Sequence, residues 1–390
     1  MAVLTSPWAT ASATVADHVV PVEPTVFPSP WAPADATVPE LVRVQWWTIT
    51  DGQRRPLYAR PRLTPAKSRQ YLDGKDGTFF PDATNTGHYT PKVNLEEINE
   101  NVTITQAGTV LRGKWIRGRV SIAAPNVTID DCLVSGPSTG SASGALVTAT
   151  NASVRNALIT DTEIAPEHPN DRVNCIEGHH LTLQRVNAHH GVDILGIIGQ
   201  LSDSQVDVKI LSSWLHTMVM SNTSTQNDNI THNDLIQWHG LLGLTLIGAR
   251  LEAFVDPTFG AANIAPTWHP TETLSNGKPK LLSGNPNYPG LWGFSAIMAS
   301  PARKLMGGFS MDRSWVDGGA VGLNWGGPTE ALFPDGGSIT DTAFGSDFRL
   351  GPEFALLTKS FRSHSISGNH RWNKANPFDT SVAYNPRRNG

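Results

Sequence analysis

Two carboxylates near the middle of the chain have the local pattern that cleavage of a glycosidic bond would need. Asp193 stands in Gly191-Val-Asp-Ile194 and Asp234 in Asn233-Asp-Leu-Ile236, two short segments in which apolar and polar residues alternate as in strands. If these strands stack, equivalent positions lie about 4.8 Å apart, and retaining glycosidases hold their two carboxyls about 5 Å apart. We predict Asp193 and Asp234 as a catalytic pair if both face outward, with His232 assisting proton transfer. The alternative is structural: both carboxylates cap turns or form a polar ladder.

Residues with rings follow this pair in the sequence and favour carbohydrate binding. A pyranose presents a flat face of C–H groups that packs on an aromatic ring, while its hydroxyls need polar partners. The predicted carbohydrate-contact residues are five ring-bearing residues and one amide: Trp238, Trp268, His269, Tyr288, Trp292 and Gln237. The alternative is that these rings fix a long loop to the body of the protein.

Neither the histidines nor the acidic residues predict a metal site. His179-His180 and His189-His190 are adjacent pairs, and neighbouring side chains of a strand point to opposite sides, so the two members of a pair do not converge on one ion. Asn227-Asp-Asn229 belongs to no ordered calcium-binding loop such as an EF-hand. Cys132 and Cys175 are too few for a disulfide framework and are predicted to be buried thiols. We therefore expect no metal and no cofactor.

A short internal repeat runs through most of the chain. An apolar–polar–apolar triplet follows a polar residue or glycine, and the spacings between the first five copies are 25, 25, 29 and 25 residues. The residues that begin the copies are Asn101, Asn126, Asn151, His180, Gln205, Gly243 and Gly308. A unit of this length holds about three strands of 4–6 residues with their turns, which is one coil of a parallel β-helix. A β-propeller does not fit, because its blades need about 40–45 residues.

Two spacings in the repeat are too long for one coil. Gln205 and Gly243 are 38 residues apart, and Gly243 and Gly308 are 65 residues apart. The surplus residues must leave the coils as loops, which we place near 218–231 and 256–292. Loops on a rigid scaffold often carry recognition, and these two leave neighbouring coils, so we expect them to flank one stretch of surface.

The first part of the chain differs in composition from the rest. Residues 1–65 hold ten prolines, and proline favours extended, polyproline-like backbone because it fixes φ and lacks an N–H donor. The same stretch holds four tryptophans, and large apolar rings are unfavourable in a solvated tail. We predict an extended Pro- and Trp-rich arm over 1–78 that docks on the body or on a partner chain, a β-helix over 79–378 and a tail over 379–390.

The composition excludes several classes of protein. Charged residues make up 16% of the chain and the formal net charge is −4, so there is no basic field for a nucleic-acid backbone. The apolar stretches are short, which argues against a membrane-spanning helix. The first basic residue is Arg43, whereas a secretory signal needs a positive region before its apolar segment. We expect neither nucleic-acid binding, nor membrane insertion, nor export by a signal peptide.

Several motifs together resemble a known family. They are Phe80-Pro-Asp-Ala-Thr-Asn-Thr-Gly87, Ala107-Gly-Thr-Val-Leu111, Glu163-Ile-Ala-Pro-Glu-His168, Ser213-Trp-Leu-His216, His232-Asn-Asp-Leu-Ile-Gln237 and Phe348-Arg-Leu-Gly-Pro352. In this order they resemble right-handed parallel β-helix proteins of the pectate-lyase-like superfamily. The version here is most similar to minor tail proteins of tailed phages that infect actinobacteria, and the resemblance covers most of the chain.

The resemblance implies a function for the chain. It implies a structural protein at the tail tip or on a fibre-like appendage, assembled in the host cytoplasm as part of the virion, that contacts the host envelope and its glycans. The expected partners are other tail proteins, bound through the N-terminal arm, and a host surface glycan, and such proteins are commonly homotrimers. The alternative is a polysaccharide depolymerase, a glycoside hydrolase or lyase that acts on cell-wall or capsular glycan. Whether the chain is an enzyme stays open at this point.

Overall fold

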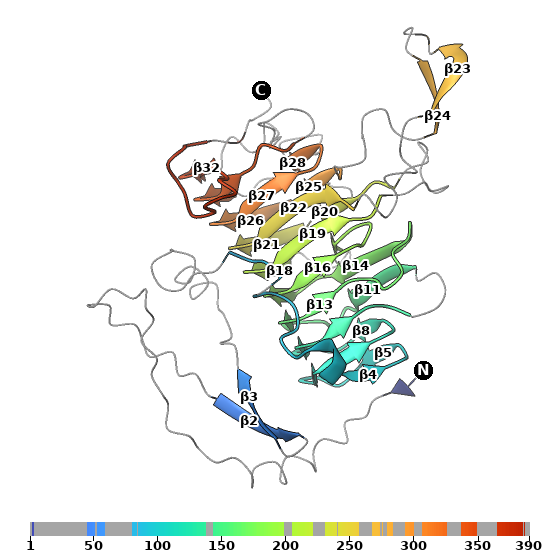
Figure 1. Cartoon of the computed structure of the whole chain (residues 1–390), viewed down its shortest axis with the longest axis vertical. Coiled ribbons are helices and arrows are strands. Elements are labelled where there is room, and N and C mark those ends of the chain that lie inside the picture. The colour runs from blue at the N-terminus through green and yellow to red at the C-terminus, as the bar shows by residue number, and fades with distance from the viewer. Residues whose placement is uncertain are drawn as a thin grey trace, which may run out of the picture. The chain divides into compact units, whose positions relative to one another are not determined.

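The computed structural model describes residues 2–3, 45–50, 53–58, 80–83, 85–137, 143–198, 205–220, 231–239, 241–256, 267–273, 275, 279–283, 293–299, 306–325, 337–348, 365–384 and 386. Within these residues the chain is all-β, apart from one short 3₁₀ turn, η3 (Lys92–Asn94). Three parallel sheets, of nine, ten and nine strands, run along one solenoid. The coils stack in chain order, as the colours of the labelled strands show (Figure 1). Each coil passes from one nine-stranded sheet, named here sheet A, to the other nine-stranded sheet, sheet B, and then to the ten-stranded sheet, sheet C. The right-handed parallel β-helix predicted from the sequence is therefore confirmed.

The strands of each sheet follow one another at intervals of one coil. Sheet A consists of β1 (Ala2–Val3), β5 (Val102–Ile104), β8 (Val120–Ile122), β11 (Gly144–Ala149), β14 (Val173–Gly178), β17 (Leu195–Ile197), β20 (Asp234–Trp238), β25 (Ser295–Ala299) and β28 (Val321–Trp325). Sheet B consists of β6 (Val110–Arg112), β9 (Thr128–Asp130), β12 (Ala157–Thr160), β15 (Leu181–Gln184), β18 (Gln205–Leu211), β21 (Leu241–Ile247), β26 (Met306–Asp312), β29 (Ser338–Thr340) and β31 (Ser365–Ser367). Sheet C consists of β4 (Glu96–Ile98), β7 (Lys114–Ile116), β10 (Leu133–Val134), β13 (Glu163–Ile164), β16 (Asn187–His189), β19 (Trp214–Met218), β22 (Arg250–Val255), β27 (Trp315–Gly318), β30 (Ala343–Phe344) and β32 (His370–Arg371).

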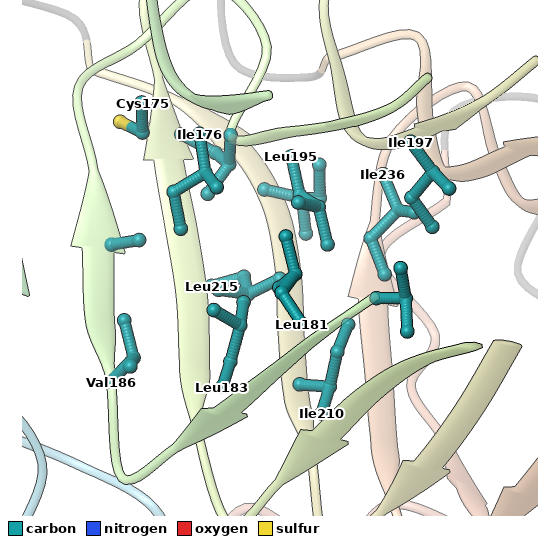
Figure 2. Close-up of a cluster of buried hydrophobic side chains, with 14 of the residues drawn as sticks. Cys175, Ile176, Leu181, Leu183, Val186, Leu195, Ile197, Ile210, Leu215 and Ile236 are labelled. Atoms are coloured by element: carbon teal, nitrogen blue, oxygen red, sulfur yellow. The ribbon is translucent and has the colours of Figure 1, made fainter. Parts of the chain in front are cut away.

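Side chains from all three sheets meet inside the coils. Alternate residues of a strand point inward, and most of the inward residues are valine, isoleucine or leucine. In the central coils Leu195 of sheet A, Ile210 of sheet B and Leu215 of sheet C are buried and point toward one another (Figure 2). Since neighbouring coils repeat this arrangement, the rows form one continuous core. Cys132 and Cys175 are free thiols in this core, as predicted, and burial raises the pKa of each to about 12.

The bend from sheet B to sheet C has the same length in every described coil from β9 onward. It consists of two residues, and the first of them has a positive φ. These first residues are Asp131, Asp161, Arg185, Ser212, Gly248, Arg313, Asp341 and Gly368. The second residue is buried and in several coils links neighbouring bends: Ser213 Oγ accepts the N–H of Val186 at 3.0 Å, and Ser314 Oγ accepts the N–H of Ala249 at 3.1 Å. Because this bend has a fixed length, insertions leave the coils at the other two bends.

The structure corrects the phase of two copies of the repeat. Most of the predicted copies fall in sheet B, but Asn101 precedes β5 of sheet A, and Asn151 lies in the bend before β12. The true equivalent of Ile129 in the next coil is Ile159 of β12, with which it pairs. For Asn101 the error arises because strands of all three sheets share the apolar–polar–apolar pattern, so one triplet does not reveal its sheet. The triplet after Asn151 lies in no strand.

Residues 80–95, named here the strap, connect coils that are far apart in the sequence. Phe80 packs edge-on against Trp315 of β27, with 4.9 Å between ring centroids. At the other end of the strap, Lys92 Nζ lies 4.0 Å from the ring centroid of Trp115 in β7. The first residue of the strap therefore contacts a late coil, and its last part contacts an early coil, so the strap runs along sheet C against the order of the coils.

Asp131 holds the middle of the strap. Its Oδ1 accepts the backbone N–H groups of Tyr89 and Thr90, each at 2.9 Å, and its Oδ2 accepts the Thr90 hydroxyl at 2.6 Å. Asp131 is also the first residue of a bend between sheets B and C, with a φ of 52°. One aspartate thus joins the strap to the coil through three hydrogen bonds.

Residues Leu4–Phe79 form a unit of their own. Its described strands, β2 (Gln45–Thr50) and β3 (Gln53–Tyr58), pair in antiparallel fashion. The prediction of an extended arm did not include this hairpin. The Asp51-Gly52 dipeptide between the two strands is typical of a two-residue hairpin turn and is the signal that would have predicted it.

The last described residues pack on the β-helix. The ring of Tyr384 lies 5.5 Å from that of Phe344, and the Arg371 guanidinium lies 4.2 Å from the Tyr384 ring centroid. Val382 and Tyr384, which lie in the predicted tail over 379–390, therefore contact the final coils. In the part of the chain that the structure describes, no helix combines the length and apolar character needed to span a membrane.

Candidate functional site

One line of side chains runs along the outward face of sheet A. From β5 to β28, the registers of seven strand pairs align one residue in each of eight strands. These eight residues are named here the sheet A column: Thr103, Ser121, Thr148, Glu177, Gly196, Gln237, Met298 and Asn324. All except Gly196 are partly exposed. Hydroxyl, carboxylate and amide groups dominate the column, and precisely oriented groups of these kinds bind the polar atoms of small ligands.

Insertions are concentrated at the two edges of sheet A. On the edge toward sheet C, residues 219–233 connect β19 to β20, and residues 256–294 connect β22 to β25. On the edge toward sheet B, residues 198–204 connect β17 to β18, and residues 326–337 connect β28 to β29. The two loops predicted from the repeat spacing fall in the first two of these segments. The long connections between described strands therefore join strand ends on both sides of the column.

Glu177 and Gln237 lie in the centre of the column, on either side of Gly196. A Cβ at Gly196 would lie 3.1 Å from Glu177 Cγ, so the Glu177 side chain occupies the space above the glycine. Asn174 Nδ2 donates a hydrogen bond to Glu177 Oε1 at 3.0 Å, and His239 Nε2 lies 3.0 Å from Gln237 Oε1. These contacts hold the carboxylate and the amide in place before any ligand arrives.

Only one member of the column was among the predicted site residues. Gln237 was predicted, whereas Glu177, Met298 and Asn324 were not. Each stands in a short strand whose pattern does not show which of its polar residues aligns with those of the next coil. The register of the stacked strands was the missing signal.

Asp193 and Asp234 lie opposite each other on successive coils, since Leu195 pairs with Ile236. Neither faces outward: their exposed fractions are 8% and 2%. Asp193 Oδ1 accepts the backbone N–H of Asp234 at 3.0 Å, and the N–H of Asp193 donates to Asn174 Oδ1 at 3.0 Å. The condition set for an outward catalytic pair is therefore not met. The two aspartates belong to a polar ladder, the alternative interpretation of the sequence.

Burial changes the protonation of this ladder. Loss of solvation, with a smaller effect of the Glu177 charge, raises the pKa of Asp193 to about 7. Loss of solvation and the charge of Asp193 raise the pKa of Asp234 well above its ordinary value. Both effects disfavour the charged form of a carboxyl.

The structure corrects the prediction for Trp238. Its side chain is fully buried in the core, where its ring lies 6.1 Å from that of Phe309. Gln237, the preceding residue, is partly exposed on the column. Because adjacent residues of a strand point to opposite faces, the two side chains do not contact the same ligand. Trp238 stabilises the coil, and the amide beside it faces outward.

The remaining predicted residues are dispersed. His232 is exposed, and its ring lies 4.5 Å from that of Phe294. Trp268 and His269 stand in β23 (Thr267–Thr273), which pairs with β24 (Pro279–Ser283) as an antiparallel hairpin within the predicted loop. Their side chains, like the whole of residues 288 and 292, lie outside the described part of the structure. The predicted roles of Trp268, His269, Tyr288 and Trp292 thus stay predictions.

A second polar cluster lies on sheet C and includes the strap. Glu163 Oε2 lies 3.5 Å from His88 Nε2, and Glu163 Oε1 lies 3.5 Å from His189 Nε2. His190 Nε2 in turn lies 2.9 Å from Asp256 Oδ2. Burial alone would raise the pKa of Glu163, but His189 and His88 lower it below its ordinary value. The cluster links the strap to β13 and β16.

The prediction that the two histidines of each adjacent pair point to opposite sides of a strand is wrong, because their rings are in contact. The two Nδ1 atoms are 2.7 Å apart in His179-His180 and 2.5 Å apart in His189-His190. His180 and His190 have φ values of 51° and 61°, and a left-handed residue ends the alternation of a strand. Among the residues that the structure describes, no three or more His, Cys, Asp or Glu side chains are arranged to hold a metal ion.

Comparison of the chain with family models, with curated proteins and with solved structures gave no match in any of the three. The fold and the sheet A column are therefore the observations from which a function follows.

Proposed function

We propose that the protein is a virion tail protein that contacts a glycan of the host envelope through the sheet A column. The column supports this function because it is a regular surface of hydroxyl, carboxylate and amide groups on a rigid scaffold. Its polar groups repeat at the strand spacing of about 4.8 Å, which suits a linear polymer of repeating units. The insertions at both edges of sheet A are the kind of loops that carry recognition on such scaffolds.

The tail context is supported by the sequence motifs that resemble β-helical minor tail proteins of phages. In that context residues 1–78 would attach the chain to other tail proteins. Three copies would assemble about a common axis, as is common among the β-helical tail proteins that the motifs resemble.

Cleavage of the bound glycan is the second candidate function. It is favoured by the pKa of Asp193, raised to about 7, because a general acid must hold its proton near the working pH. Asn174 contacts both Asp193 and Glu177, and thereby connects the buried carboxyl to the column. The burial of Asp193 favours the structural role instead.

The test is binding of the full-length protein to immobilised cell-envelope polysaccharides of actinobacteria. Wild type is compared with the double variant Gln237→Ala and Asn324→Ala, which removes two amides from the column. Each lost hydrogen bond weakens binding by about 1 kcal/mol, so we expect roughly tenfold or greater loss of affinity. Ser338→Ala, on the outward face of sheet B, is the matched control and should bind as wild type does.

The outcome separates the two candidates. Binding without new reducing ends or unsaturated products supports attachment. Products that appear with wild type and vanish in Asp193→Asn support cleavage. Failure of wild type to bind any of these glycans, or full affinity in the double variant, contradicts the proposed contact surface.

A further inference from the structure

The charge of the sheet A column restricts the glycan that it can accept. Its eight residues include one ionisable side chain, Glu177, and no lysine or arginine. Two arginines stand at the edge of the same sheet, Arg119 directly before β8 and Arg172 directly before β14. Arg172 Nε already lies 3.8 Å from Asp171 Oδ1. The eight residues of the described column therefore carry one negative charge near its middle and no positive charge.

Glu177 is held at this position. Asn174 Nδ2 donates to its Oε1 at 3.0 Å, and the side chain lies over Gly196, where a Cβ would come within 3.1 Å of Glu177 Cγ. Because Gly196 and Gln237 follow Glu177 in register, a polymer lying along the column must pass the carboxylate. The charge of Glu177 also acts on Asp193, whose pKa it helps to raise.

We propose that the sheet A column selects uncharged glycans and discriminates against polyuronates and other anionic polysaccharides. This inference rests on the proposed glycan contact and adds the class of ligand. Two like charges about 4 Å apart repel by about 1 kcal/mol even in water, and more beside a protein surface. An anionic polymer is thus expected to bind at least about fivefold more weakly than its neutral counterpart.

The test uses a neutral and an anionic polymer built on rings of galactose configuration, linear galactan and polygalacturonate, with the full chain at pH 7. Wild type should bind galactan at least about fivefold more tightly, and about 1 M salt should reduce the difference because it screens the carboxylate. Glu177→Gln keeps an oxygen acceptor for Asn174 and removes the charge. In this variant we expect the ratio of galactan affinity to polygalacturonate affinity to fall about fivefold, because the repulsion of the anionic polymer is removed.

Glu97→Gln is the control, because Glu97 is a partly exposed carboxylate of sheet C, paired with Arg117 at 3.1 Å and outside the column. It should leave both affinities unchanged.

Equal or tighter binding of polygalacturonate by wild type would overturn the inference and leave the proposed function standing. A Glu177→Gln variant that discriminates between galactan and polygalacturonate as strongly as wild type would also overturn the inference alone. Loss of galactan binding in the amide double variant would still support the surface, whereas no binding of either polymer or of any envelope glycan would contradict the proposed function itself.

Discussion

Asp193 Oδ1 accepts a hydrogen bond from the backbone N–H of Asp234, one coil further along, at 3.0 Å. In the sequence these two carboxylates resemble a catalytic pair. In the structure both are buried and form part of a polar ladder that links neighbouring coils. Asn174 continues the ladder by accepting the N–H of Asp193. In the fold, the side chains of Asp193 and Asn174 accept hydrogen bonds from buried backbone N–H groups, which are costly to leave without partners.

The ladder predicts that stability falls as pH rises. Burial raises the pKa of Asp193 to about 7, above the value of about 3.9 for an unfolded aspartate. Between these values the folded state binds more protons than the unfolded state, so the free energy of unfolding decreases with pH and is lowest above about pH 7. Asp193→Asn keeps the acceptor for the Asp234 N–H and removes the titration of residue 193, whereas the raised pKa of Asp234 still makes stability depend on pH in the same direction.

Urea unfolding at pH 5 and pH 8 measures this effect. Wild type should lose on the order of 2 kcal/mol between the two pH values, and Asp193→Asn clearly less. Identical pH profiles in the two proteins would show that the carboxyl is not buried as described.

Gln237 and Trp238 give a test of which face of β20 meets the ligand. Trp238→Ala should lower the free energy of unfolding by about 3–5 kcal/mol, because it empties a large core position. It should leave the glycan affinity of the folded fraction unchanged. Gln237→Ala should weaken glycan binding and change the free energy of unfolding by less than about 0.5 kcal/mol. Loss of binding in a Trp238→Phe protein that remains fully folded would show that the indole contacts the ligand.

Removal of the Asp131 carboxylate should release the strap. Asp131→Ala abolishes three hydrogen bonds to residues 89 and 90 and places alanine at a φ of 52°. A loss of about 2–4 kcal/mol is expected from hydrogen bonds to a charged group and from the left-handed backbone. Amide hydrogen exchange of residues 85–95 should increase before the core exchanges. Asp131→Asn, which retains Oδ1 and tolerates the left-handed region, is the control and should protect the strap nearly as wild type does.

The buried ion pair of Asp161 and Arg185 should contribute far more than a surface pair. Arg185 Nε and Nη2 donate to the two carboxylate oxygens at 2.8 and 2.5 Å, and the two side chains are 3% and 4% exposed. Asp161→Asn leaves the guanidinium buried without its opposing charge and should cost about 3–5 kcal/mol. Asp207→Asn breaks the exposed pair with Lys209 and should cost less than about 0.5 kcal/mol. Thermal unfolding of both variants checks the contrast, and similar melting temperatures would contradict it.

The repeat in the sequence was sufficient to determine the fold class. Apolar–polar–apolar triplets at a spacing near 25 residues require stacked coils with apolar rows inside, and the sequence also indicated the free buried thiols Cys132 and Cys175. It placed Asp193 and Asp234 in corresponding strands of successive coils, within one residue of alignment, and the register of the structure makes them direct neighbours. These features depend on the composition and on the spacing of the repeat, and both can be read from the amino-acid sequence without knowing how the strands pair.

Only the tertiary structure decided which way each side chain points. Asn101 and Asn151 were assigned to the wrong phase, Trp238 to the wrong face, and His189-His190 to opposite sides of a strand. The physical reason is that the side chains of a strand alternate with a period of two, so a shift of one residue, or one left-handed residue such as His190, reverses the face. The sheet A column exists only through the register between coils, and register is a property of the stacked strands together.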